Sequence, residues 1–386
     1  MRFLYNVISF IRRGGFLFFL LCIALFLSRR TGYISIIAFF SILIFPKVRK
    51  LDKTAGLLLV YLLFYLLFSF FNGFSYDLST LVLYGVAPLI FYFYGNQITR
   101  QYKNDYDFIW VWYIIVLCYC LDVFFVTISD IVSTGQIIAL ERSLDIVDGN
   151  AGEIKINATQ LGLAMDIGMI GLPMCVLVKK KILRIAFFVL FFFSLLTTFH
   201  LLNRTGIIVA IICFIGVMFY YSRKNTKLLF NSVFFIFVVY FVLVFTGILN
   251  EELIELYSNR NEDISTMGSR TERWSDAIGN LFLYPLGWTK GPKDLHYVHN
   301  MWLDIAKISG IVPFLILLYL SVKSFIVSLK LVKRFNNNSS YMLLGLNICF
   351  GASCFVEPIY GGTHFLLYCL LWGCQNSIYN NSSKLK

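Results

Sequence analysis

The chain has 386 residues, of which 59% are hydrophobic, 18% aromatic and only 14% charged. Soluble proteins carry about 25% charged residues, so this composition excludes a soluble globular domain and is typical of an integral membrane protein. The net charge of +12 does not indicate nucleic-acid binding, because the lysines and arginines form no basic domain and do not alternate with aromatic residues on a polar segment.

In chain order, the predicted elements are apolar segments of about 20 residues, the length that crosses a bilayer as a helix. The first is interpreted as an uncleaved span, because Arg29 and Arg30 follow it instead of the small residues of a signal-peptide cleavage site. The chain is expected to be a single all-α, polytopic membrane domain over residues 1–386 with about 12 transmembrane helices. The twelve segments are 14–28, 31–46, 54–72, 78–95, 107–128, 159–178, 182–201, 205–221, 228–249, 311–329, 341–358 and 363–379.

The distribution of basic residues predicts the orientation of these spans, because lysines and arginines are enriched on the cytoplasmic side. With the N-terminus inside, most of the 33 lysines and arginines fall in inner loops or tails, and only Arg29 and Arg30 oppose the scheme. Both termini are therefore expected in the cytoplasm. Two polar segments then face outward: an acidic first loop, 129–158, and a large late loop, 250–310, which contains short helices.

No cofactor motif is visible. The nine cysteines lie in or beside apolar runs without a Cys-x-x-Cys pair, so they are expected to be small buried side chains. The chain also lacks an Asp-x-Asp, a His-Glu-x-x-His, a P-loop and a Gly-x-Ser-x-Gly motif. Neither a metal nor another cofactor is expected.

The large outer loop carries two predicted helices. Ser269, with Glu272 three residues later, forms a capping box that predicts a helix starting at Ser269. Pro285 and Gly287 end that helix. A second helix is predicted over residues 297–309, stopping at Gly310.

Three arginines on the outer side are candidate anion ligands. Arg270 and Arg273 lie in the first turns of the first loop helix, where free backbone N–H groups and the helix dipole favour anions. Arg204 opens the predicted span 205–221 at its outer end. The alternatives are that Arg204 is an interfacial anchor and that Arg270 and Arg273 form a solvated face beside Glu272.

Further candidates follow in the same loop. His299, placed by prediction in the first turn of the second helix, is either an ordinary residue there or a base that takes a proton from a sugar hydroxyl. Asn300 either orients a substrate or caps the helix. Trp274 shares a helix face with Arg270 and either stacks on it or anchors the helix at the membrane interface. Glu357, at the outer end of a later span, is a second candidate base.

With these residues in place, the chain resembles the bacterial O-antigen polymerase and ligase family, which includes the Wzy-like polymerases, over about residues 157–372. Three motifs match: Asn203-Arg204-Thr205-Gly206; Arg270-x-x-x-Trp274 followed by Pro285 and Gly287; and His299-Asn300 followed after nine residues by Gly310-x-x-Pro313. The third motif ends in glycine in the family, where this chain has Pro313, and this difference argues against the ligase branch.

The resemblance implies a metal-independent glycosyltransferase of the cytoplasmic membrane, acting on its outer side. An O-antigen, capsule or exopolysaccharide polymerase of this kind transfers an oligosaccharide from polyprenyl pyrophosphate to another lipid-linked repeat unit. Arg204, Arg270 and Arg273 would hold the pyrophosphate, His299 or Glu357 would act as base, and a chain-length regulator is an implied partner beside membrane lipid.

Two other functions remain open at this stage. An O-antigen ligase would move finished polymer onto another acceptor. A lipid-linked oligosaccharide flippase or other transporter would only bind the pyrophosphate in transit. Asp122 and Asp166, which lie inside predicted spans, would suit proton-coupled transport.

Overall fold

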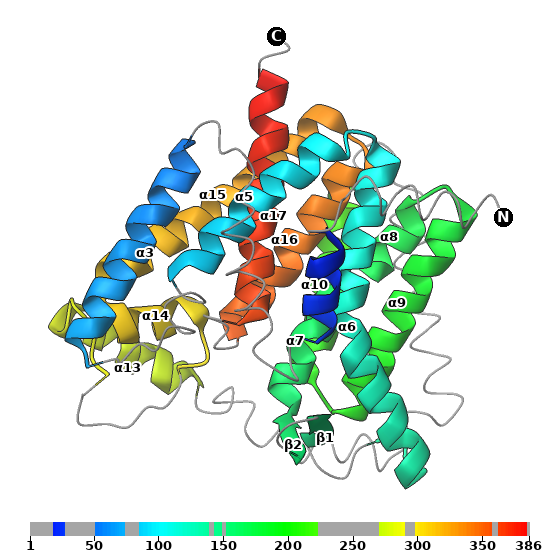
Figure 1. The fold of residues 1–386 in the computed structure, drawn as a ribbon, viewed down its shortest axis with the longest axis horizontal. Helices are drawn as coiled ribbons and strands as arrows, with labels where there is room; N and C mark the ends of the chain where they lie inside the picture. The colour runs from blue at the N-terminus through cyan, green and yellow to red at the C-terminus, as the bar shows by residue number, and fades with distance from the viewer. Residues whose placement is uncertain are drawn as a thin grey trace.

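The computed structural model of the chain describes residues 18–27, 51–73, 85–138, 143–148, 152–222, 270–289, 298–356 and 362–383. The described part is a bundle of helices with one antiparallel hairpin (Figure 1). Its elements are α3 (Lys53–Phe71), α5 (Ala87–Gln101), α6 (Asp105–Thr134), β1 (Ser143–Asp148), β2 (Gly152–Asn157), α7 (Ala158–Gly168), α8 (Gly171–Leu177), α9 (Lys181–His200), α10 (Arg204–Ser222), α13 (Arg270–Leu283), α14 (Met301–Ser309), α15 (Ile311–Phe335), α16 (Asn338–Val356) and α17 (Thr363–Ser383).

Seven candidate membrane spans lie in the described part, so the chain is a polytopic membrane protein. They are α3, α6, α7 with α8, α9, α10, α15 and α16. The predicted spans 31–46 and 228–249 lie outside the described residues, and the count of twelve stays a prediction. α5, which overlaps the end of the predicted span 78–95, and α17, which covers the predicted span 363–379, are not among the seven.

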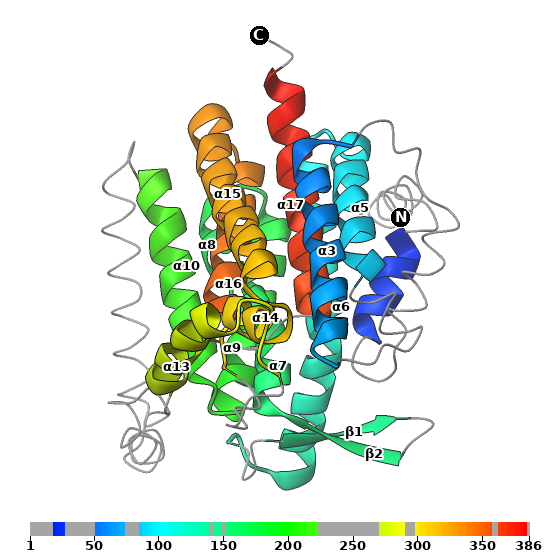
Figure 2. The same cartoon turned by 90° about the vertical axis from the view of Figure 1, so that its left-hand side faces the viewer.

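The predicted loop 129–158 has more structure than expected. α6 continues to Thr134, where Gly135 closes the helix in a left-handed conformation with φ 68°. β1 and β2 then pair from Ser143 opposite Asn157 to Asp148 opposite Gly152. The hairpin, α13 and α14 lie towards one end of the bundle, and the C-terminal end of α17 lies at the other (Figures 1 and 2).

α5 and α17 pack with their backbones close together because glycines remove the side chains between them. A Cβ added at Gly95 would lie 2.0 Å from the carbonyl oxygen of Leu370, and one at Gly373 would lie 1.9 Å from that of Tyr92. Small residues that let backbones touch are a common means of helix association in membranes, where lipid is as apolar as leucine. The Asn376 amide adds a hydrogen bond to the Tyr92 hydroxyl at 3.1 Å.

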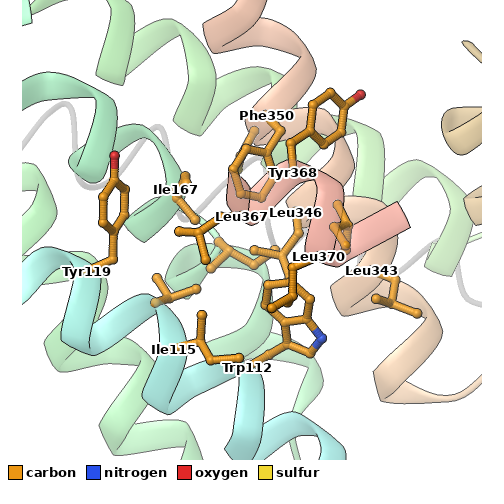
Figure 3. Close-up of a cluster of buried hydrophobic side chains, with 14 of the residues drawn as sticks. Trp112, Ile115, Tyr119, Ile167, Leu343, Leu346, Phe350, Leu367, Tyr368 and Leu370 are labelled. Carbon is orange, nitrogen blue, oxygen red and sulfur yellow. The ribbon is translucent and has the colours of Figure 1, made fainter. Parts of the chain in front are cut away.

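The centre of the bundle is filled mainly by aromatic and branched side chains from α6, α7, α16 and α17 (Figure 3). The rings of Phe350 and Tyr368 stack at 5.2 Å, and Tyr368 lies 4.8 Å from Trp372. A buried polar ladder crosses α15, α16 and α17: Asn347 donates to Ser324, Ser324 donates to Gln375, and Gln375 donates to Ser328. The ladder fixes how these three helices meet, since polar groups in a membrane have few other partners.

Candidate functional site

Arg204 is the first residue of α10, directly after a tight turn from α9. Leu202 adopts φ 50° in this turn, and the Asn203 N–H bonds back to the Thr198 carbonyl at 2.9 Å. The side-chain oxygen of Asn203 then accepts the Thr205 N–H at 3.0 Å. The turn therefore fixes the backbone at Arg204, whose side chain is half-buried.

The same turn is pressed against α7 and α9. A Cβ at Gly162 would lie 1.8 Å from the Asn203 amide nitrogen, and one at Gly206 would lie 2.8 Å from the Thr198 hydroxyl. A side chain at position 162 or 206 would collide with these polar groups, which explains why both residues are glycine.

A buried histidine ties the end of α9 to the end of α6. Nδ1 of His200 lies 2.8 Å from the Ile137 carbonyl oxygen, and Nε2 lies 2.9 Å from a carboxylate oxygen of Asp130. This contact links the last turn of α6 to the turn that carries Arg204.

α13 begins at Arg270, and the predicted cap, Ser269, lies outside the described residues. Arg270 and Arg273 are both half-buried in its first turn. The Trp274 indole N–H donates to the Val298 carbonyl at 3.0 Å, and its ring meets Phe355 edge-on at 5.0 Å. Trp274 therefore packs α13 onto α14 and α16.

The second loop helix starts later than predicted. α14 begins at Met301 with Asn300 as its N-cap, so His299 is not in the first turn but just before the helix, with φ 57°. The predicted end at Gly310 is confirmed. The left-handed conformation at His299 is uncommon for a residue with a side chain, and the bonds around it explain how it is held.

Asp304 holds the backbone on both sides of His299. One carboxylate oxygen accepts the Val298 N–H at 2.8 Å, and the other accepts the Asn300 N–H at 3.3 Å. Burial raises the pKa of Asp304, and this effect outweighs the two backbone donors and the nearby His299 and Lys307, which lower it.

Asn300 joins α14 to the end of α16. Its side-chain oxygen accepts the Leu303 N–H at 3.2 Å, and its amide donates to the Phe355 carbonyl at 3.1 Å. The capping role considered from sequence is therefore observed, while a role in orienting substrate stays a prediction.

Residues of α13 and α14, the two helices predicted in the large loop, meet at the end of α16. Phe355 contacts Trp274 of α13, Trp302 of α14 and the Asn300 amide. α10 packs antiparallel along α16, with Tyr221 against Tyr341 at 5.3 Å. This register brings Arg204, at the opposite end of α10, close to the level at which α16 ends.

One predicted site residue cannot be placed in this arrangement. Glu357, the alternative base, lies outside the described residues. Within those residues, no group of three or more His, Cys, Asp or Glu side chains is suited to hold a metal ion.

Sequence reasoning missed Asp304 and Phe355. An aspartate in the first turn after an Asn cap is a recognisable signal, but starting the helix too early placed Asp304 in mid-helix. Phe355 had no signal, since it is one apolar residue in an apolar span.

No protein-family model matches the chain, and no curated protein matches its sequence.

Proposed function

We propose that the protein is a polysaccharide polymerase that transfers an oligosaccharide from polyprenyl pyrophosphate to another lipid-linked repeat unit on the outer side of the cytoplasmic membrane. One observation carries the proposal: residues far apart in the sequence meet around Phe355. They are Trp274 of α13, and Asn300 and Trp302 of α14. These elements carry Arg270, Arg273 and His299, on which the resemblance to O-antigen polymerases rests.

Arg204, Arg270 and Arg273 are proposed to bind the pyrophosphate. All three are half-buried, and a guanidinium that is partly shielded from water binds phosphate oxygens more strongly than an exposed one. Among the described residues, no hydrogen bond or ion pair of the Arg204 side chain is found. Its positive charge would offset the negative charge that develops on the leaving pyrophosphate.

His299 is proposed as the base on the acceptor side. It would take the proton of an acceptor hydroxyl as that oxygen bonds to the anomeric carbon of the donor, while the bond from that carbon to the pyrophosphate oxygen breaks. It lies directly before the N-cap of α14, and its backbone is held in a left-handed conformation with φ 57°.

The test is elongation by purified protein supplied with lipid-linked repeat units. His299→Asn is the sharpest variant, because asparagine tolerates the left-handed conformation but cannot act as a base. We expect elongation about 10²–10⁴-fold slower with donor binding retained. Elongation at the parental rate would refute the histidine mechanism.

Arginine variants test donor binding in the same assay. Arg270→Lys keeps the charge but loses the two-pronged geometry, so it should impair elongation, and Arg270→Ala should nearly abolish it. Arg100→Ala, in the exposed last turn of α5, is the matched control and should elongate normally. Full-length polymer from both Arg270 variants would return Arg270 to a solvated surface role.

A transporter is the second candidate, because two acids lie inside the bundle. Asp122 on α6 and Asp166 on α7 are 0% and 1% exposed, and buried acids inside a membrane often serve ion or proton pathways. A transporter would move labelled lipid-linked oligosaccharide across proteoliposome membranes without elongating it. It should depend on Asp122 or Asp166 and not on His299.

A further inference from the structure

α13 has three distinct faces. Trp274, Ala277 and Leu281 form the first face, which packs towards α14 in a small apolar cluster. Ile278 and Phe282, four residues apart, share the second face and are exposed.

The third face of α13 is polar. It carries Glu272, Asp276 and Asn280, each four residues from the next, and the two acids are exposed. A helix exposed to water on all its outer sides would not need a separate apolar face, so the second face requires a partner.

The second face continues into the turn after α13. Ile278, Phe282, Leu283, Tyr284 and Leu286 are between 45% and 73% exposed and form what we call the α13 apolar patch. Single exposed apolar residues are ordinary, but five large ones within nine residues mark an interaction surface.

The patch adjoins the lipid-facing surface of a membrane span. The Asn72 amide, at the end of α3, donates to the Leu286 carbonyl at 2.5 Å, and the Thr289 hydroxyl donates to the Asn72 carbonyl at 2.9 Å. The last residues of α3, Phe70 and Phe71, are 65% and 66% exposed. Figure 2 shows α13 running obliquely to the long helices rather than alongside them.

We infer that α13 is an in-plane interfacial helix whose apolar patch is seated in the outer-leaflet lipid beside the end of α3. Its acids and arginines balance, with Glu272 and Asp276 against Arg270 and Arg273, so attraction to anionic headgroups does not hold it there. Instead, α13 is held by burial of its apolar side chains at the boundary between headgroups and acyl chains. This placement of α13 holds whether the protein acts as a polymerase or as a transporter.

The test is photo-crosslinking of the full-length protein in lipid nanodiscs made of zwitterionic phosphatidylcholine alone. A benzophenone amino acid replaces Phe282 on the patch, or Asp276 on the polar face as the matched control. A third position, Leu63 on α3, is a lipid-facing reference, since its side chain is 59% exposed on a membrane span. Mass spectrometry then detects a phospholipid adduct on each variant.

We expect phospholipid adducts at position 282 at a yield close to that at position 63 and several-fold above that at position 276. Replacing Ile278, which shares the second face, in place of Phe282 should give the same result if the first variant is poorly produced. Equal, low yields at 282 and 276 beside a normal yield at 63 would overturn the inference. A crosslink from 282 to a second copy, or to another segment of this chain, would also overturn it.

Discussion

The sharpest structural prediction concerns Asp304, the residue that holds the turn around His299. Its two carboxylate oxygens accept the buried N–H groups of Val298 and Asn300 at 2.8 and 3.3 Å. Hydrogen bonds to a charged group contribute about 1.5–3 kcal/mol each. The left-handed backbone at His299, with φ 57°, costs about 1–2 kcal/mol for a residue with a side chain, so the two bonds are sufficient to offset it.

Asp304→Ala removes both acceptors, and we expect amide hydrogen exchange at 298 and 300 to accelerate about 10–150-fold, the factor equal to 1.5–3 kcal/mol. Asp304→Asn keeps one acceptor, so only one of the two amides should accelerate. Asp276→Ala, on the exposed face of α13, is the control and should change neither. Parental exchange rates in Asp304→Ala would refute the proposed role of this carboxylate in holding the turn.

Asp304 also predicts a pH dependence with a defined sign. Because burial raises its pKa above the ordinary value of 3.8, the folded state binds the proton more tightly than the unfolded state. The contribution of Asp304 to stability is therefore greatest below that value and falls as the pH rises through the raised pKa. Thermal unfolding of the parent and of Asp304→Asn should show this slope only in the parent, and equal slopes would contradict it.

Three further predictions concern packing. Gly373→Ala should lower the melting temperature strongly, because the new Cβ would lie 1.9 Å from the Tyr92 carbonyl oxygen, whereas Gly351→Ala, with no atom within 4 Å, should be neutral or slightly stabilising. Asn72→Ala should accelerate hydrogen exchange in the turn after α13, since it removes the bond to the Leu286 carbonyl, and unchanged exchange would argue against this link. His200→Phe should loosen the last turn of α6, detected as faster exchange there, because the contacts to Asp130 and to the Ile137 carbonyl are lost.

A local sequence signal located the end of α14 correctly, at Gly310. The cap of α3 is local in the same way, since Asp52 accepts the Ala55 N–H at 2.8 Å. Such signals succeed because a cap involves residues within one turn of each other. They failed for His299, whose conformation depends on Asp304 and on the Val298 carbonyl that receives the Trp274 N–H from α13.

The sequence by itself determined that this is a membrane protein, because hydropathy and span length are properties of one segment and need no partner. It also supplied the arginines and the histidine as candidates. Only the tertiary structure decided which of them lie near the end of α16, how closely α5 crosses α17, and which face of α13 is left for lipid. These features depend on the register between helices, and an apolar span carries little information about register because many side chains would satisfy it equally well.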